Sequence, residues 1–191
     1  MSSHVVIKVV IFTVDGDQLK VFLPLGKLTQ GSVAEQESLD KAVMKLCPFP
    51  GGYLEQLYTF SRRKGIEIVY YILLPHYTVT SAKNWVSVRK IKKNSFDDYE
   101  VVTYALQRLR WKVEYTNVVY SLLSEEFTLS ELQRTYETIL GKELDKRNFR
   151  KKILSLGIIK ATGKYRKGSV ARPALIYSFK ERKPVMVKVF S

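Results

Sequence analysis

The alternation of apolar and polar positions divides the chain into two parts of different character. In the first part, β-branched and aromatic residues gather in short runs typical of strands, and a turn of sequence Asp-Gly-Asp at residues 15–17 joins the first two runs into a hairpin. Two other stretches repeat apolar residues at helical spacing. The pattern predicts an α+β domain with strands at residues 4–14, 19–25, 53–60, 67–75 and 85–88, and helices at residues 37–46 and 97–109.

The second part is predicted to begin with three short helices. Thr128 and Glu131 form a T-x-x-E capping box, in which each side chain satisfies a backbone N–H of the first turn, and Gly141 ends the helix that they open. Asp145 is placed to cap the next helix, and Gly157 is placed to stop it. The three helices are expected at residues 116–123, 128–140 and 145–156.

A basic β-hairpin follows these helices in the pattern. Strand-like runs at residues 158–161 and 174–179 flank a loop, residues 162–173, that carries glycines and four basic side chains. Three short helices followed by a hairpin is the element order of a winged helix. The sequence therefore predicts two domains, residues 1–110 and residues 111–191.

The charge balance favours a polyanionic partner. The 191 residues have a formal net charge of +14 and a pI of about 9.8. Residues 1–110 contain 15 basic and 10 acidic residues, whereas the shorter segment 111–191 contains 17 and 8. A nucleic acid, an acidic membrane and an acidic protein would all suit this charge, but its concentration in the predicted winged helix favours nucleic acid.

The predicted helix at residues 145–156 has two different faces. On a helical wheel, Phe149, Ile153 and Leu156 fall on one side, and the opposite side carries basic and amide side chains. No acidic residue follows Asp145 to balance this charge, although a merely solvated helix usually mixes both signs. Arginine can bridge guanine O6 and N7, and asparagine can bridge adenine N6 and N7. The composition of this face thus suits the edges of base pairs.

We therefore expect this helix to enter the major groove of duplex DNA, with the hairpin loop on the phosphate backbone. A membrane is not an expected partner, because the longest apolar runs are too short to span a bilayer. The predicted DNA contacts are Thr128 at the start of the preceding helix, Lys146, Arg147, Asn148, Arg150 and Lys151 on the reading helix, and Lys164, Arg166, Lys167 and Arg172 on the loop.

Cysteine and histidine usage argues against several other kinds of site. Cys47 is the only cysteine, so the chain cannot form an internal disulfide, and we expect a reducing, cytoplasmic compartment. His4 and His76 lie far apart in the sequence and lack metal-ligand spacing. The sequence therefore predicts neither a bound metal nor a cofactor.

Several segments resemble the Nudix-related transcriptional regulators. FTLSELQ with TYETILG, DKRNFRKKIL and RPALIYSF resemble the winged helix of that family, and the resemblance is strong over residues 95–179. YLEQLYTF and EIVYYILLP resemble two strands of its Nudix-like domain. The resemblance implies a Nudix-like α/β/α sandwich followed by a winged helix-turn-helix domain. It also implies a homodimeric repressor that binds a palindromic operator and senses ADP-ribose, an NAD-related metabolite or a sugar.

The Nudix box, G-x5-E-x7-R-E-U-x-E-E-x-G-U with U a bulky aliphatic residue, is degenerate in this chain. Aligned from Gly31, the box keeps its first glutamate, Glu37, but lacks the three later carboxylates that hold divalent metal against a diphosphate. Pro48 and Pro50 would also break the helix that must present them. Nudix catalysis is therefore not expected. The box positions for arginine, the three later glutamates and the final glycine are occupied by Lys45, Leu46, Phe49, Pro50 and Gly52.

These observations predict a DNA-binding transcriptional regulator that has no catalytic residues and uses its N-terminal domain for dimerisation and effector sensing. Two alternatives remain open. A divergent Nudix hydrolase would need carboxylates that the box lacks. A nucleic-acid-binding scaffold would use the winged helix without a specific operator, and a comparison of duplex DNA with RNA across a range of salt concentrations would distinguish it.

Overall fold

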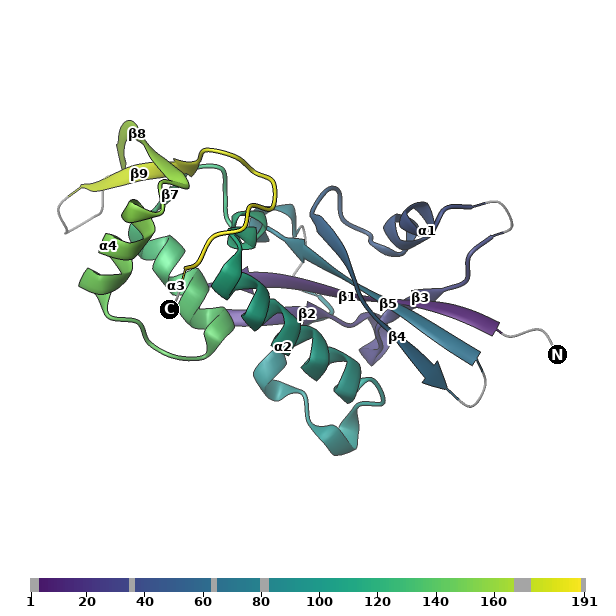
Figure 1. The fold of residues 1–191 in the computed structure, drawn as a ribbon. Helices are drawn as coiled ribbons and strands as arrows, with labels where there is room; N and C mark the ends of the chain where they lie inside the picture. The colour runs from purple at the N-terminus through teal and green to yellow at the C-terminus, as the bar shows by residue number, and fades with distance from the viewer. Residues whose placement is uncertain (1–3, 35–36, 63–64, 80–82, 167–172, 190–191) are drawn as a thin grey trace. The chain divides into compact units, whose positions relative to one another are not determined.

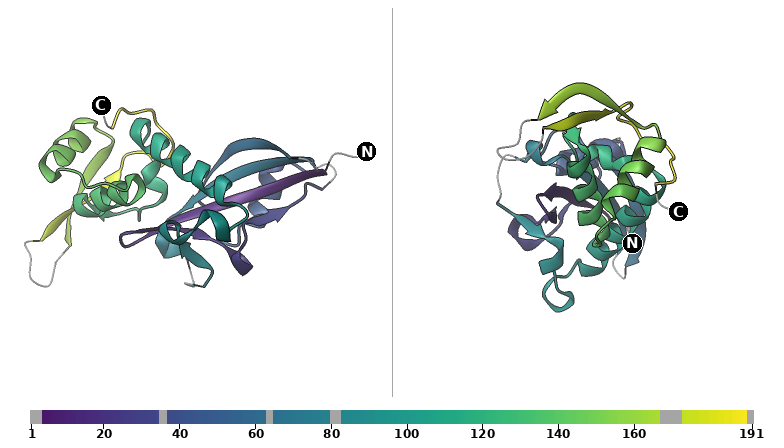
Figure 2. Two further views of the ribbon diagram at one scale, coloured as in Figure 1. Left: turned by 90° about the horizontal axis from the view of Figure 1, so that it is seen from below. Right: turned by 90° about the vertical axis from the view of Figure 1, so that its left-hand side faces the viewer.

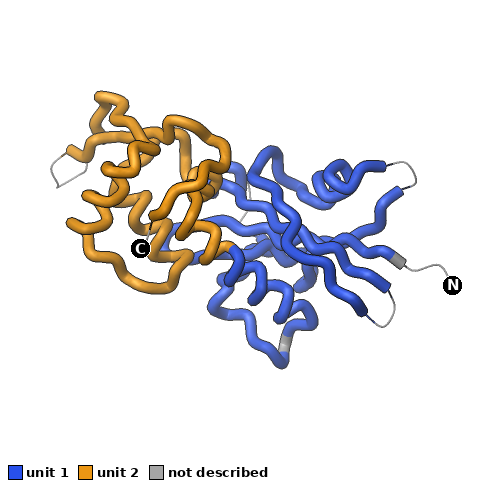
Figure 3. The backbone as a smooth tube through the Cα atoms, viewed as in Figure 1, with its two compact units in different colours: residues 1–108 blue, residues 109–191 orange. Residues whose placement is uncertain are grey.

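The computed structural model describes residues 4–34, 37–62, 65–79, 83–166 and 173–189. The chain divides into two compact units, unit 1 (residues 1–108) and unit 2 (residues 109–191), which are coloured separately in Figure 3. The sequence pattern places the boundary two residues later, between residues 110 and 111. Both positions lie inside one helix, α2 (Tyr99–Tyr115).

A mixed β-sheet forms the middle of unit 1 (Figure 1). Its strand order is β4-β5-β1-β2-β6, and β3 pairs with the first half of β1. β1 runs parallel to β5, and its turn into β2 is the predicted hairpin, in which Gly16 has φ 62°, a conformation that glycine adopts without strain. The strands are β1 (His4–Asp15), β2 (Gln18–Phe22), β3 (Thr29–Gly31), β4 (Tyr53–Arg62), β5 (Gly65–Leu74) and β6 (Trp85–Ser87).

Helices cover both faces of this sheet, which is seen from two further directions in Figure 2. Ile7 and Val9 of β1 lie in the core beneath α1 (Leu39–Leu46). Lys8, between them, reaches Asp98 at the start of α2. Because neighbouring residues of a strand point to opposite faces, α1 and α2 lie on opposite sides of the sheet. The α/β/α sandwich predicted for this part of the chain is confirmed.

Helix α2 is longer than the apolar pattern indicates. The buried positions Val101, Ala105 and Leu109 continue to Val113, at a spacing of four residues, so one stripe of the helix stays buried to its last turn. The helix therefore begins two residues after the predicted start and extends past the predicted end at residue 109. None of the helices in the described part of the chain is both long and apolar enough to cross a bilayer.

The helix-turn-helix and the hairpin of the predicted winged helix form in unit 2. Two helices are followed by a hairpin, and a short strand before the helices completes a three-stranded sheet of order β7-β9-β8. Leu132, Tyr136 and Ile139 on one face of the first of these helices are fully buried and form much of the core. The elements are β7 (Phe127–Thr128), α3 (Leu129–Leu140), α4 (Lys146–Ser155), β8 (Ile159–Arg166) and β9 (Ala174–Phe179).

The helix predicted at residues 116–123 is wrong. Only a short 3-10 turn, η5 (Val118–Ser121), forms there. The Asn117 N–H donates to the carbonyl oxygen of Val185 at 3.2 Å, and the Asn117 side chain bonds to Lys183 O and Val185 N at 3.1 and 2.7 Å. Thr116 also forms an antiparallel bridge with Met186, so these residues pair with a segment far along the chain instead of opening an α-helix.

The hairpin also differs from its prediction. Residues 162–166, expected in the loop, continue strand β8, because Tyr165 and Arg166 pair with Leu175 and Ala174 of β9. The two-residue strand β7 was not expected, since so short a run leaves no alternating pattern. The wing is therefore a longer ribbon than the sequence indicates, with a register irregularity between Ala161 and Tyr165.

An ion cluster lies under the start of α2. Lys8 Nζ is 2.7 Å from Asp98 Oδ1 and 2.9 Å from Glu67 Oε1, and Arg62 Nε donates to Glu67 at 2.9 Å. The side chains of Lys8, Glu67 and Asp98 are only 12%, 17% and 13% exposed. Burial acts to raise the pKa of Glu67, but its hydrogen bonds from Arg62 and Lys8 outweigh burial and hold that pKa below its usual value.

Replacing Lys8 with methionine is expected to lower the free energy of unfolding of unit 1 by about 3 kcal/mol at neutral pH, because Glu67 and Asp98 would stay buried without their ammonium partner. The lowered pKa of Glu67 means that its ionised form stabilises the fold above about pH 4.5, and this contribution is lost as the pH falls further. The difference between wild type and Lys8→Met should therefore shrink in acid. Urea unfolding between about pH 3 and pH 7 measures it.

Lys20→Met is the matched control, because it removes the partner of Asp15 from a more exposed ion pair. It should cost no more than about 1 kcal/mol. A Lys8→Met protein as stable as the wild type at neutral pH would contradict a structural role for the cluster.

Candidate nucleic-acid interface

The predicted capping box fixes the start of α3. Thr128 Oγ1 accepts a hydrogen bond from the Glu131 N–H at 3.2 Å, and Glu131 Oε2 accepts one from the Thr128 N–H at 2.7 Å. At the other end, Gly141 has φ 71°, and its N–H donates to the carbonyl oxygen of Glu137 at 2.8 Å. Both ends of α3 confirm the sequence prediction.

The turn from α3 to α4 is held by two side chains that the sequence analysis missed. Gln133 Nε2 donates to the carbonyl oxygen of Leu144 at 2.8 Å, and Glu137 Oε1 accepts from the Leu144 N–H at 2.9 Å. Gln133 also donates to Glu137 at 2.9 Å, so the pair clamps Leu144. Asp145, next along the chain, caps α4 as predicted by accepting from the Asn148 N–H at 2.8 Å. Clamp and cap together set where α4 begins.

The structure confirms the buried and exposed faces that the helical wheel predicts for α4. Phe149 and Ile153 are buried, and the Phe149 ring packs edge-on against Tyr136 of α3, with centroids 5.5 Å apart. Leu156, just past the helix, is half-buried, whereas Leu154 is 48% exposed. The apolar contact with α3 therefore fixes the rotation of α4 about its axis.

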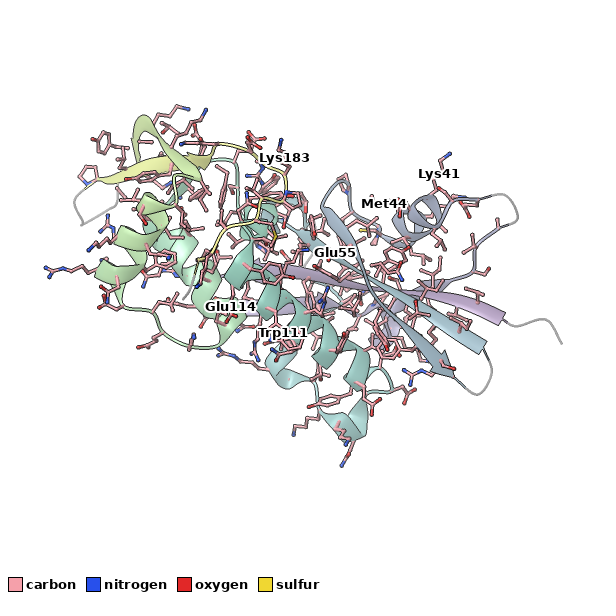
Figure 4. All side chains as sticks on the ribbon, in the orientation of Figure 1. Lys41, Met44, Glu55, Trp111, Glu114 and Lys183 are labelled. Carbon is pink, nitrogen blue, oxygen red and sulfur yellow. The ribbon has the colours of Figure 1, made fainter. Side chains whose placement is uncertain are left out.

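The rest of α4 presents its basic side chains to solvent. Figure 4 shows nitrogen-tipped side chains projecting from this helix. No ion pair within the described ranges neutralises any of them, and Asp145 at the cap is the one carboxylate of the segment. This surface can meet an extended anion without first breaking internal salt bridges. Its exposed members are Lys146, Arg147, Asn148, Arg150 and Lys151.

Thr128, the predicted DNA contact at the start of α3, is not available in the same way. Its side chain is buried, and its hydroxyl accepts from the Glu131 N–H and also lies within hydrogen-bond distance of Glu131 Oε2, at 3.1 Å. The structure thus gives Thr128 a role in capping α3, and the DNA contact expected of it stays a prediction.

The wing places two of its predicted contacts beside acidic side chains of the helix-turn-helix. Lys164 Nζ is 2.6 Å from Glu126 Oε1, and Arg166 Nη1 forms an ion pair with Glu131 Oε1. Lys164 and Arg166 are both exposed. Lys167 and Arg172, also expected to contact DNA, lie outside the described residues.

In unit 1, the degenerate Nudix box folds differently from a metal site. Helix α1 ends at Leu46, and Cys47 after it already has extended backbone angles. Phe49 then turns into the core, where its ring lies 5.1 Å from the ring of Phe22 and 5.4 Å from that of Trp85. An aromatic cluster thus holds one of the positions where the box would present a carboxylate.

The remaining charged groups of the box pair with each other. Glu37 lies before α1 rather than inside it, and its Oε1 is 2.5 Å from Lys45 Nζ. Among the described residues there is no group of three or more His, Cys, Asp and Glu side chains that could hold a metal ion. The single carboxylate that the box retains is engaged by an ammonium group.

The two box glycines are closed in by apolar side chains. A Cβ atom at Gly31 would lie 2.9 Å from Leu46 Cδ2. Gly52 has φ 103°, and a Cβ there would lie 2.7 Å from Leu74 Cδ2 and 2.9 Å from the carbonyl oxygen of Leu73. At Gly52 the positive φ and the contact with the Leu73 backbone require glycine, whereas at Gly31 a side chain would have to displace only the tip of Leu46.

Comparisons with known proteins agree with this architecture. The sequence model of the NrtR DNA-binding winged helix domain matches residues 119–179. The chain is 30% identical over 141 residues to the ADPR responsive transcriptional repressor NtrR of Acinetobacter baylyi. The match covers 66% of this chain and 56% of that protein, so it spans little more than half the length of the relative.

Solved structures extend the likeness to nearly the whole chain. The crystal structure of Shewanella oneidensis NrtR complexed with a 27mer DNA is 26% identical, with a TM-score of 0.76 over 92% of this chain and 93% of that one. A MutT/nudix family protein from Enterococcus faecalis is 19% identical, with a TM-score of 0.67 over 94% and 87% of the two chains. The second likeness concerns the fold alone.

Fold and site together define a winged helix-turn-helix protein whose N-terminal unit has a Nudix-type fold and lacks the three later carboxylates of the box. The chain is similar to the Nudix-related transcriptional regulators both in its winged helix and in its overall fold, as the resemblance of its segments indicated.

Phe149→Ala is expected to destabilise unit 2 by about 3–5 kcal/mol, because it removes a buried ring and leaves a cavity against Tyr136. Leu154→Ala, on the exposed side of the same helix, should change stability by no more than about 0.5 kcal/mol. Chemical denaturation followed by circular dichroism compares the two. Equal effects of the two substitutions would mean that α4 is not held by the face described above.

Proposed function

We propose that this protein is a cytoplasmic transcriptional repressor that binds a palindromic duplex operator as a homodimer. The observation that carries the proposal is the exposed face of α4, where Arg147, Asn148 and Lys151 lie opposite the buried Phe149 and Ile153. A dimer with two such helices would read two half-sites, and its two-fold symmetry would be mirrored in the operator.

The chemistry of this face supports sequence reading rather than charge attraction alone. Arginine offers a planar pair of donors that matches guanine, and asparagine offers both a donor and an acceptor, which matches adenine. Arg147 and Asn148 stand at the start of α4, the end that enters the groove in helix-turn-helix proteins. Lys164 and Arg166 on the wing would hold the phosphate backbone and position the helix.

The proposal assigns no hydrolytic activity to unit 1. Hydrolysis of Nudix type needs several carboxylates on one divalent metal, and the box here offers only Glu37, which is paired with Lys45. Phe49 is packed among aromatic rings, and Pro50 supplies no ligand oxygen. A divergent Nudix hydrolase is accordingly the less favoured alternative.

We further propose that unit 1 senses an ADP-ribose-like molecule, an NAD-related metabolite or a sugar. The support is the Nudix-type fold together with the name of the Acinetobacter baylyi relative, an ADPR responsive repressor. If the ligand binds the free and the DNA-bound protein with different affinity, DNA must change ligand affinity by the same factor. A Nudix-type fold that lacks its metal ligands could bind such a ligand without hydrolysing it.

Arg147→Ala and Asn148→Ala should each weaken operator binding by about 1–3 kcal/mol while changing the affinity for random duplex DNA much less. Lys164→Ala should weaken both alike and leave their ratio nearly unchanged, because phosphate contacts carry no sequence information. The operator is first selected from random duplexes with the purified protein, and fluorescence anisotropy then gives both affinities.

Arg134→Ala on α3 is the matched control, because it removes an exposed arginine from outside the predicted contacts. It should leave the specificity ratio unchanged. If the Arg147→Ala and Asn148→Ala proteins bind the selected operator like the wild type, α4 is only a basic surface. If no palindrome is selected, the scaffold without a specific operator is the better description.

With Mg²⁺ or Mn²⁺ present, the protein should leave ADP-ribose intact, because three metal-ligand positions of the box lack carboxylates. Bound ADP-ribose should raise the melting temperature of unit 1 and lower operator affinity. Chromatography of the nucleotide, thermal unfolding and anisotropy measure the three effects. Turnover that Glu37→Gln abolishes would establish an enzyme instead, and a thermal screen without any ligand would leave unit 1 a purely structural domain.

A further inference from the structure

We propose that Glu126 and Glu131 compete with DNA for the cations of the wing. In the free protein their carboxylates hold Lys164 and Arg166, and a bound duplex must take these cations over with its phosphates. The two glutamates thereby limit the affinity of the protein for every duplex. This inference rests on the proposed function, since it assumes that the wing contacts the phosphate backbone.

The geometry shows that the wing cations are already engaged. Lys164 Nζ lies 2.6 Å from Glu126 Oε1, and Arg166 Nη1 pairs with Glu131 Oε1. Arg166 Nη2 also donates to the main-chain oxygen of Glu126 at 3.5 Å. The basic side chains of α4 differ, because within the described residues none of them forms an ion pair with an acidic side chain. The acidic side chains are therefore directed at the phosphate-contacting part of the interface and not at its base-reading part.

These ion pairs are not needed to hold the wing in place. The wing is a backbone ladder, in which Tyr165 and Arg166 of β8 pair with Leu175 and Ala174 of β9. Thr162 Oγ1 adds a hydrogen bond across the ladder to the carbonyl oxygen of Ile176. Removing either carboxylate would leave this framework unchanged, so what the carboxylates chiefly supply is negative charge.

Both pairs are exposed enough to be exchanged easily. The side chains of Lys164 and Glu126 are 65% and 41% exposed, and those of Arg166 and Glu131 are 48% and 40% exposed. Ion pairs in contact with water are weak, because water and salt screen them. The phosphates of a duplex offer the same cations oxygen acceptors with the same single negative charge, and arginine can bind a phosphate through two parallel N–H bonds.

Glu131 has a second position that suits an anion. Its Oε2 accepts from the Thr128 N–H at the beginning of α3, a helix of 12 residues. The N-terminus of a helix attracts negative charge, including the phosphates of nucleic acids. In the free protein one carboxylate therefore serves both the helix end and the wing arginine, and both attractions are satisfied before DNA arrives.

Competition of this kind acts only through phosphate contacts. Phosphates are the same in every duplex, so the glutamates should weaken specific and non-specific binding by the same factor. The specificity ratio would stay the same, while less of the protein would be retained on random DNA at a given salt concentration. Glu126 and Glu131 would thus adjust the overall affinity without contributing to sequence recognition.

The test measures duplex affinity of the full-length protein with Glu126→Gln and Glu131→Gln. Each substitution should raise the affinity for operator and random DNA alike, by about two- to fivefold at moderate salt. Glutamine is also accepted at this position of a capping box, so Glu131→Gln keeps the start of α3 intact. Glu125→Gln is the matched control, because Glu125 is exposed, is next to Glu126 and has no ion pair within the described ranges.

A double-mutant cycle with Lys164→Gln separates competition from general charge. If Glu126 competes for Lys164, Glu126→Gln should lose its gain when Lys164 is already glutamine, apart from the small gain that Glu125→Gln also shows. Equal gains from Glu126→Gln and Glu125→Gln in both backgrounds would overturn the inference in favour of net charge. Weaker binding by Glu126→Gln and Glu131→Gln would overturn it in favour of carboxylates that position the cations. A wild-type protein that binds no duplex would instead overturn the proposed function.

Discussion

The burial of Phe149 and Ile153 against α3 determines what the C-terminal unit presents to its surroundings. A helix can bury only one face, and once these two side chains are in the core, the rotation of α4 is decided. The basic and amide side chains must then point outward together. The clamp of Gln133 and Glu137 on Leu144 fixes the start of the helix in the same way. The exposed basic surface of α4 is thus a consequence of apolar packing and of a hydrogen-bonded turn.

Much of this arrangement could be predicted because its causes are local. The capping box of Thr128 and Glu131, the Asp145 cap and the Gly141 end each depend on residues within four positions of one another. The alternation along β1 and the apolar stripe of α4 follow from the periods of strand and helix. The loss of the Nudix carboxylates is also visible in a linear alignment. A single sequence is sufficient where neighbours along the chain decide the structure.

The rest depends on contacts between distant segments. Asn117 is held by Val185, 68 residues further on, and Thr116 bridges to Met186 where a helix was predicted to begin. The acidic partners of Lys164 and Arg166 lie 38 and 35 residues away in the sequence. The sequence alone therefore indicates an unpaired basic loop, and the ion pairs appear only in the folded structure. Strand β7 exists only because β9 pairs with it. No periodicity in the sequence reports such pairings.

The box glycines bear on how the N-terminal unit could change in evolution. Gly52 has a positive φ and is enclosed by Leu74 and the backbone of β5, so steric packing retains it whether or not the site performs chemistry. A motif glycine that is retained for steric reasons is not evidence of surviving activity. Single substitutions to glutamate would also not restore the metal-binding carboxylates. A glutamate at position 46 would bring charge into the contact with Gly31, and positions 49 and 50 lie beyond the end of α1. Regaining a metal site of this kind would require a longer α1 and removal of Phe49 from the aromatic cluster with Phe22 and Trp85.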